Sequence, residues 1–182
     1  MELLRRVIIF YKRHFTSCED YARYIGVKIG KGCDIVTKNF SSEPYLIEIG
    51  DYVRIASKTA FFTHGGVRCS IRKYYNNPTL DYFGKIKIGD YTYIGENCMI
   101  MPGVTIGTRC MIGAGTVLTK SVPDGCMVAG NPCRFIGYTD NFYQKIIKFD
   151  VKTAGKSASD KKKILLELTE DSFIKKGFVK VN

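Results

Sequence analysis

The sequence predicts an all-β solenoid in which short strands stack into parallel coils. The main observation is a six-residue repeat across residues 88–123, where an aliphatic side chain returns at a fixed step: Ile88, Ile94, Ile100, Ile106, Ile112 and Leu118. Four residues after each of these comes a small or compact side chain: Thr92, Cys98, Val104, Cys110, Thr116 and Val122. A period of six fits neither a helix nor the two-residue alternation of a strand taken alone. It is typical of a solenoid in which each repeat forms one strand and one corner.

The repeat also predicts how the interior is filled. Glycine follows four of the six aliphatic residues, and a residue without a Cβ allows the tight backbone of a corner. We expect the aliphatic side chains to point inward and the small side chains to pack beside them. Three repeats then complete one triangular coil, and the stacked coils share one continuous apolar column.

The same step continues upstream and is interrupted twice, at residues 37–48 and 65–85. The upstream positions that keep it are Ile29, Ile35, Ile49, Ile55 and Phe61. A solenoid tolerates insertions at its corners because a loop there leaves the stacked core intact. The first insertion contains Ser41-Ser42-Glu43-Pro44, which we interpret as a turn-rich spacer without evident chemistry.

The length of 182 residues suits one domain with helical appendages. We expect an N-terminal cap over residues 1–25, a β-helix domain over 26–137 with a loop at 65–85, and a helical extension over 138–182. Seven cysteines without a CxxC pair argue against a disulfide framework. Three of them, Cys33, Cys98 and Cys110, occupy the small position of the repeat, so we interpret them as structural and expect a reducing, cytoplasmic compartment.

The N-terminal segment has the pattern of a basic amphipathic helix. Its apolar run is too short for a signal peptide or a membrane span. Basic and apolar side chains alternate along it: Arg5, Arg6, Lys12 and Arg13 beside Leu4, Val7, Ile8 and Phe15. We favour a cap over the open end of the solenoid, because exposed solenoid ends need covering. Contact with a membrane surface is the alternative.

Two helices are expected in the C-terminal extension. Residues 141–149 form the first, and residues 153–159 read as a flexible linker. Ser159 or Asp160 is the expected N-cap of the second, which runs from Lys161 to about Glu170. Docking against a neighbouring subunit is the simplest role for this extension.

A formal net charge of +11 raises the question of nucleic-acid binding. No recognition-helix, zinc-finger or aromatic-plus-basic RNA signature accompanies the charge, so we expect no nucleic-acid partner. Much of the excess lies in the flanks, as in Lys161-Lys162-Lys163. Such runs are solvated faces by default, and attraction to anionic ligands is the functional alternative.

The second insertion begins directly after His64, one of two histidines in the chain. A loop of this length is expected to have a function, and its polar and aromatic side chains suit a sugar acceptor: Arg68, Arg72, Tyr74, Tyr75 and Tyr82. His64 stands at the edge of a rigid coil beside that loop, a position that suits a catalytic base. A surface histidine at a strand end is the equally weighted alternative. The other histidine, His14, is interpreted as structural or solvated.

Four features together resemble the hexapeptide-repeat acyltransferases: the Ile-Gly repeats, Thr63-His64 before a loop, Met101-Pro102-Gly103-Val104, and Ala129-Gly130-Asn131-Pro132. Within that superfamily the chain looks like the maltose, galactoside and xenobiotic acetyltransferase branch, and bacterial polysaccharide O-acetyltransferases in particular. The resemblance covers roughly residues 25–137 in the sense of an internal-repeat match. It implies a left-handed parallel β-helix, assembled as a homotrimer with an active site at each subunit boundary.

The resemblance also implies the chemistry. Acetyl-CoA is the expected donor, without a metal, and the expected acceptor is a small molecule or glycan hydroxyl, with His64 as general base. The family binds the pantetheine arm at repeat corners, which in this chain are Ala114-Gly115 and Thr119-Lys120. Lys120 and Arg134 are the candidates for the CoA phosphates.

One position departs from the family at the expected site. Relatives often carry Asp after Thr-His, whereas this chain has Gly65, so the carboxylate that orients His64 is unassigned, with Asp81 and Glu96 as guesses. Two alternatives to an O-acetyltransferase stay open: an N-acetyltransferase of a free or nucleotide-linked amino sugar, and a non-catalytic β-helix. A γ-type carbonic anhydrase is disfavoured because it needs about three histidines around zinc.

Overall fold

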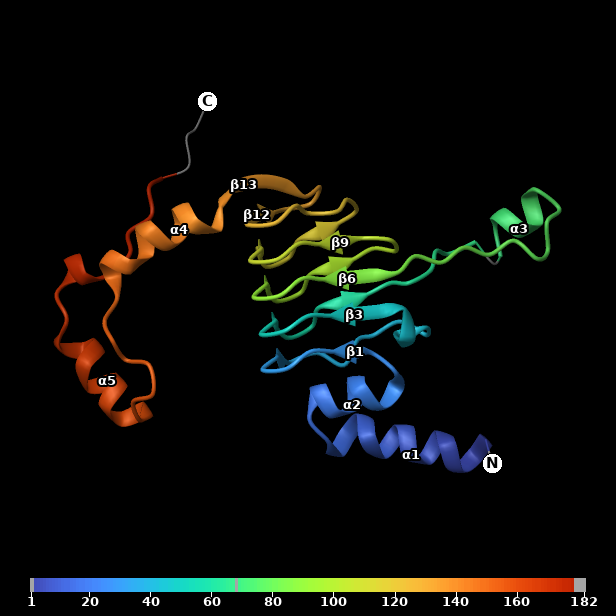
Figure 1. The fold of residues 1–182 in the computed structure, drawn as a ribbon, viewed down its shortest axis with the longest axis horizontal. Helices are drawn as coiled ribbons and strands as arrows, with labels where there is room; N and C mark the ends of the chain where they lie inside the picture. The colour runs from blue at the N-terminus through green and yellow to red at the C-terminus, as the bar shows by residue number, and fades with distance from the viewer. Residues whose placement is uncertain (1, 68, 179–182) are drawn as a thin grey trace. The chain divides into compact units, whose positions relative to one another are not determined.

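The computed structural model describes residues 2–67 and 69–178. Its strands form three sheets, which are the three faces of a coil stack (Figure 1). The first sheet contains β1 (Lys28–Ile29), β3 (Ile47–Ile49), β6 (Ile86–Ile88) and β9 (Thr105–Ile106). The second contains β2 (Asp34–Ile35), β4 (Arg54–Ile55), β7 (Tyr93–Ile94), β10 (Met111–Ile112), β12 (Cys126–Ala129) and β13 (Arg134–Tyr138). The third contains β5 (Ala60–Phe61), β8 (Met99–Ile100) and β11 (Val117–Leu118).

The strand register follows the repeat, as the sequence predicts. Ile94 pairs in parallel with Ile112, three repeats later, and Ile100 pairs with both Phe61 below it and Leu118 above it. Equivalent positions of successive coils therefore stack, and all six aliphatic side chains of the repeat are buried. Burial of this column is the main stabilising contribution to the fold.

The small position of the repeat is also buried, and its polar side chains bond to the backbone of the coil above. Thr92 Oγ1 donates to the carbonyl of Gly107 at 2.8 Å, and Cys98 Sγ lies 3.2 Å from the carbonyl oxygen of Gly113. Burial raises the pKa of the Cys98 and Cys110 thiols. Both cysteines are therefore unreactive packing residues, in agreement with the sequence-based interpretation.

The N-terminal segment forms two helices, where one was expected. Helix α2 (Cys18–Ile25) begins at Ser17, whose Oγ accepts from the Asp20 N–H at 3.0 Å, and ends at Gly26 with φ +109°. Ala22 of α2 is fully buried in the core of the coil stack, so α2 is the cap. Helix α1 (Glu2–Phe15), the basic amphipathic segment, packs on α2 instead of on the open end (Figure 1).

The C-terminal end of the coil stack closes with a β-hairpin. Residues 126–129 form β12, which adds to β10 in parallel, and β13 returns antiparallel to β12. The hairpin between them carries the Gly-Asn-Pro motif, and the Gly130 N–H donates to Thr116 Oγ1 at 3.2 Å. The reversal of strand direction ends the coil because an antiparallel strand cannot start another parallel turn.

Residues 140–182 form a unit separate from residues 1–139. They contain most of α4 (Thr139–Ile146), the 3₁₀ turn Ile147–Phe149, α5 (Ala158–Glu167) and a second 3₁₀ turn, Glu170–Ser172. Helix α5 starts three residues before the predicted Lys161, because Ser157 is its N-cap: Ser157 Oγ accepts from the Asp160 N–H at 3.1 Å and donates to its carboxylate at 2.7 Å.

The second insertion leaves the stack as an extended arm between β5 and β6 (Figure 1). The two sides of the arm pair where it leaves the corner, through an antiparallel bridge between His64 and Phe83. A short helix, α3 (Ile71–Tyr74), lies at its far end, well away from the sheets. In the part of the chain that the structure describes, no helix is both long enough and apolar enough to cross a membrane.

Candidate active site

His64 lies at the corner that follows β5, where the arm begins. The preceding Thr63 is fully buried, and its carbonyl accepts from the Gly84 N–H at 2.8 Å, so both ends of the arm are held at this corner. The His64 side chain is 37% exposed and lines two hollows, of about 470 and 380 Å³. The ring is thus held by a rigid coil and remains open to a ligand.

The orienting carboxylate belongs to Glu43. Glu43 Oε2 lies 2.8 Å from His64 Nδ1 and accepts a second hydrogen bond from Thr63 Oγ1 at 2.7 Å. The Glu43 side chain is only 18% exposed. It directly precedes the 3₁₀ turn Pro44–Leu46, in which Pro44 is buried, so the backbone that presents the carboxylate is itself anchored.

The charge on Glu43 determines which imidazole nitrogen carries the proton. Removal from water would raise the pKa of the Glu43 carboxyl, but hydrogen bonds from Thr63 and His64 outweigh it and lower the pKa from 4.5 to about 2. An ionised carboxylate only accepts hydrogen bonds, so His64 Nδ1 must be the donor. In a neutral imidazole the lone pair is then on Nε2. His64 is therefore held in the tautomer that a general base requires.

Glu43 was not predicted from the sequence, where Asp81 and Glu96 were the candidates for this role. Asp81 instead pairs with Arg72 at 3.0 Å, and Glu96 pairs with Lys58 at 3.5 Å. The sequence did contain one signal: both insertions interrupt the repeat at the same corner, in successive coils. In the structure this corner brings the insertions together, because Asn39 bridges to Ala60 and the Thr63 N–H donates to Ser41 Oγ. A carboxylate in the first insertion lies for that reason directly below Thr63-His64.

The arm residues predicted to bind the acceptor fall into different places. Arg72 braces the arm, donating from Nε to the carbonyl of Leu80 at 2.5 Å as well as pairing with Asp81. Tyr74 and Tyr75 are 83% and 68% exposed and contact each other edge to face around α3. Neither lines a hollow at His64. Only Tyr82 lies at the histidine corner, where its hydroxyl and ring edge occupy the space that a Cβ at Gly65 would fill. Arg68 lies outside the described residues.

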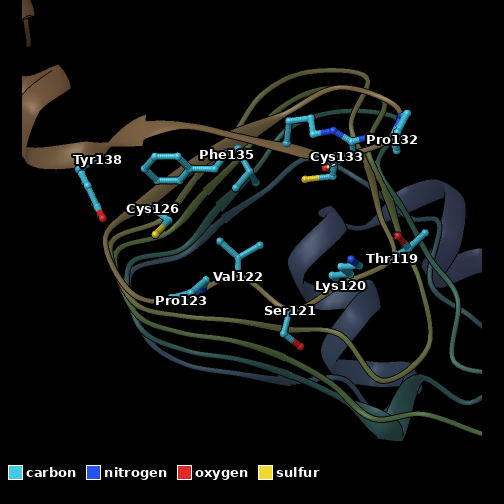
Figure 2. A pocket seen from close by; sticks show the side chains of 12 residues that line it. Thr119, Lys120, Ser121, Val122, Pro123, Cys126, Pro132, Cys133, Phe135 and Tyr138 are labelled. Carbon is cyan, nitrogen blue, oxygen red and sulfur yellow. Dashed lines mark hydrogen bonds between the residues drawn. The ribbon is translucent and has the colours of Figure 1, made fainter.

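A separate hollow of about 640 Å³, which we call the second hollow to distinguish it from the pair at His64, opens beside the last coil. The segment after β11 supplies Thr119 and Lys120, and the β12–β13 hairpin supplies Pro132, Cys133 and Arg134 (Figure 2). Its remaining walls are largely apolar: Val122, Pro123, Cys126, Val128, Phe135 and Tyr138, with Ser121. Three of the five predicted cofactor residues therefore share one site that has both cations and apolar surface.

Ala114 and Gly115 are at a different corner, between β10 and β11. The Ala114 backbone lies against Gly95 of the coil below so closely that a Cβ on Gly95 would collide with it. Gly115 has φ +69°, a left-handed conformation that glycine adopts without strain, and a Cβ there would meet open space. These two residues form an open corner that is not part of the wall of the second hollow.

The His64 corner and the corner that carries Thr119 and Lys120 lie along one edge of the coil stack. His64 follows β5 and Lys120 follows β11, and β8 is the single strand between them in the third sheet. Neighbouring strands are about 4.8 Å apart, which places the two corners about 10 Å apart along the stack. Among residues 2–67 and 69–178, no group of three or more His, Cys, Asp or Glu side chains is placed to hold a metal ion.

Comparison with known proteins shows which family the chain belongs to. A family model described as bacterial transferase hexapeptide (six repeats) matches residues 85–120. Protein CapG of Staphylococcus aureus is 41% identical over 151 residues, covering 81% of this chain and 87% of that protein. The chain belongs to the hexapeptide-repeat acyltransferases. The putative acetyltransferase YvoF of Bacillus subtilis is 34% identical over 130 residues, covering 70% of this chain and 69% of that protein.

Two solved structures extend the comparison within the hexapeptide-repeat acyltransferases. A maltose O-acetyltransferase from Clostridium difficile 630 has a TM-score of 0.53 and 30% identity, covering 66% of this chain and 73% of that one. A hexapeptide-repeat acetyltransferase from Vibrio cholerae, complexed with acetyl coenzyme A, has a TM-score of 0.50 and 25% identity, covering 66% and 75%. The predicted family and enzyme class are thus confirmed, and the chain is an acetyltransferase.

Proposed function

We propose that this acetyltransferase is an acetyl-CoA-dependent O-acetyltransferase that modifies a sugar hydroxyl in surface-polysaccharide biosynthesis. The observation that carries the proposal is the His64–Glu43 pair, which leaves Nε2 with its lone pair at the edge of a hollow. Among the described residues, Nε2 has no protein hydrogen-bond partner. The resemblance to a maltose O-acetyltransferase supports a sugar as acceptor.

In this mechanism His64 Nε2 takes the proton of the acceptor hydroxyl as its oxygen attacks the acetyl carbonyl carbon. The imidazolium that forms is stabilised by the ionised Glu43 carboxylate at 2.8 Å from Nδ1. The carbon–oxygen bond forms, the carbon–sulfur bond breaks, and the proton on Nε2 passes to the leaving sulfur. Proton balance therefore needs no group beyond His64.

Acetyl-CoA suits the second hollow by its chemistry. Lys120 and Arg134 offer positive charge for phosphates, and Val122, Pro123, Val128 and Phe135 offer apolar surface. The two corners are about 10 Å apart along the stack, so the pantetheine arm of acetyl-CoA can reach from these cations toward His64. The open corner at Ala114 and Gly115 is proposed as a further backbone contact.

We propose that the enzyme is a homotrimer of left-handed coils, as in the family, and that it works in the cytoplasm. The exposed arm supports the homotrimer. Neither Tyr74 nor Tyr75 lines the hollows at the His64 of its own chain. We propose that α3 instead reaches the acceptor site of a neighbouring subunit. An acceptor panel of sugars and amino sugars distinguishes O-transfer from N-transfer.

Tyr82 is the arm residue proposed to contact the acceptor beside His64. The Cβ of an alanine at position 65 should push the Tyr82 ring away. Gly65→Ala and Tyr82→Ala are therefore both expected to raise the acceptor KM roughly fivefold, which corresponds to a loss of about 1 kcal/mol of binding free energy. The double variant should be no worse than either single one. Steady-state kinetics over a range of acceptor concentrations test this, and additive effects would show that the two residues act separately.

The donor site is tested by titrating acetyl-CoA into the protein in a calorimeter at moderate salt. Saturable binding near one site per chain is expected, and Lys120→Ala and Arg134→Ala should each weaken it about fivefold to tenfold by removing a phosphate contact. Lys161→Ala, at an exposed lysine of α5, is the matched control and should bind normally. Equal weakening by all three variants would mean that the attraction is nonspecific, and absence of saturable binding would contradict the proposed function.

A further inference from the structure

Helix α1 packs on the body of the protein through the side that carries Ile9 and Lys12. Among the α1 side chains that the structure describes, Ile9 and Lys12 are half-buried. Lys12 Nζ lies 5.6 Å from the centre of the Tyr24 ring of α2. At the end of α1, Lys38 Nζ donates to the carbonyls of Arg13 at 2.5 Å and Thr16 at 2.7 Å. These contacts hold α1 in one rotational orientation.

That orientation turns the apolar face of α1 to the outside. Residues three, four and seven apart share one face of a helix, and on this face the following large side chains are exposed: Leu3, Leu4, Val7, Phe10, Tyr11 and Phe15. Leu3 is 76% exposed and Phe15 is 69% exposed. An amphipathic helix in a globular protein normally buries this face, so an exposed one marks an interaction surface.

Basic side chains lie along the border of the apolar face. Arg6 and Arg13 are both exposed and are seven residues apart, two turns along the same edge. In the sequence of α1 the only acidic residue is Glu2. A helix with large apolar side chains on one side and arginine or lysine beside them lies in the plane of a lipid interface, with the basic groups at the headgroups.

We propose that α1 docks this protein on an anionic membrane surface, with its apolar face in the lipid and with Arg6 and Arg13 on the headgroup phosphates. Charge complementarity favours lipid over a second copy of α1, because pairing two such faces would bring like charges together, whereas anionic headgroups neutralise them. Arg13 also lines the hollow next to His64. Docking by α1 therefore brings the acceptor side of the active site close to the membrane surface.

Co-sedimentation with phosphatidylcholine vesicles, with and without phosphatidylglycerol, tests the proposal on the full chain. The wild type should bind the anionic vesicles, and its binding should weaken as salt is raised. Leu3→Glu removes one inserted side chain and adds a repelled charge, and should lower the partition coefficient about tenfold or more. Leu166→Glu is the matched control, since Leu166 of α5 is also 76% exposed, and it should bind as the wild type does.

Size-exclusion chromatography with light scattering and thermal melting show whether each variant keeps its fold and assembly. Absence of wild-type binding to anionic vesicles would overturn the proposal, and so would equal binding by Leu3→Glu and Leu166→Glu. If Leu3→Glu changed the oligomeric state instead, the face would be a subunit interface and the proposal would be wrong. Acetylation of a small water-soluble acceptor should be unchanged in Leu3→Glu, which separates this surface from the chemistry of the site.

Discussion

Replacement of His64 by alanine is expected to lower kcat about 10²–10⁴-fold, the usual contribution of a positioned general base. The KM for acetyl-CoA should change little, because the proposed donor contacts lie at Lys120 and Arg134, about 10 Å along the stack. Initial rates with saturating donor and an accepted sugar measure the effect. The residual rate reflects binding and orientation of the two substrates, which the substitution leaves in place.

His14→Ala is the matched control for that experiment. His14 is the only other histidine in the chain, and its Nδ1 bonds to the carbonyl of Phe10 at 2.8 Å on the exposed helix α1. This variant should turn over at the wild-type rate. Unchanged turnover in the folded His64→Ala protein would refute the proposed mechanism, whatever the control does.

Glu43→Gln is expected to have the second largest effect, a fall in kcat of roughly 10–10³-fold. In serine proteases the equivalent carboxylate-to-amide change costs about 10⁴-fold because the histidine is left in the wrong tautomer, and partial exposure of the His64 corner moderates the loss here. A glutamine NH₂ placed at Oε2 would donate to His64 Nδ1 and force the proton onto Nε2, where the base is needed. A neutral amide also removes the charge that stabilises the imidazolium.

Glu43→Asp provides the comparison, because it keeps the charge and shortens the reach of the carboxylate. It should recover part of the lost kcat, and donor KM should be the same in all three proteins. If Glu43→Gln retained full kcat, the hydrogen bond to His64 would be merely structural.

The pH dependence of stability gives an independent measurement on the same carboxyl. The pKa of Glu43 is about 2 in the folded protein and about 4.5 in the unfolded chain, so between these pH values the unfolded state binds more protons. The contribution of this group is thus fully present above about pH 4.5 and is lost as the pH falls toward 2. The urea concentration at the midpoint of unfolding should fall more between pH 5 and pH 3 in the wild type than in Glu43→Gln. An equal fall would mean that the Glu43 pKa is not lowered on folding.

Local sequence was enough to predict the coil stack and the place of the histidine. The column from Ile88 to Leu118 is built from residues six apart, so the spacing itself states which side chains meet, and the observed register follows it. Thr63-His64 was found because the repeat visibly stops there. The prediction that Lys120 and Arg134 bind the CoA phosphates came from the family resemblance. The structure places both residues in one hollow.

Two features depended on contacts made by segments outside the repeat. Glu43 reaches His64 from an insertion one coil lower, and an insertion has no period from which its register can be read. The outward face of α1 depends on which side of the helix Lys38 and Tyr24 hold. A hydrophobic pattern states that a helix has an apolar face, but only tertiary packing decides whether that face is buried. The sequence by itself therefore determined the repeating core, and the tertiary structure decided the partner of His64 and the exposed face of the first helix.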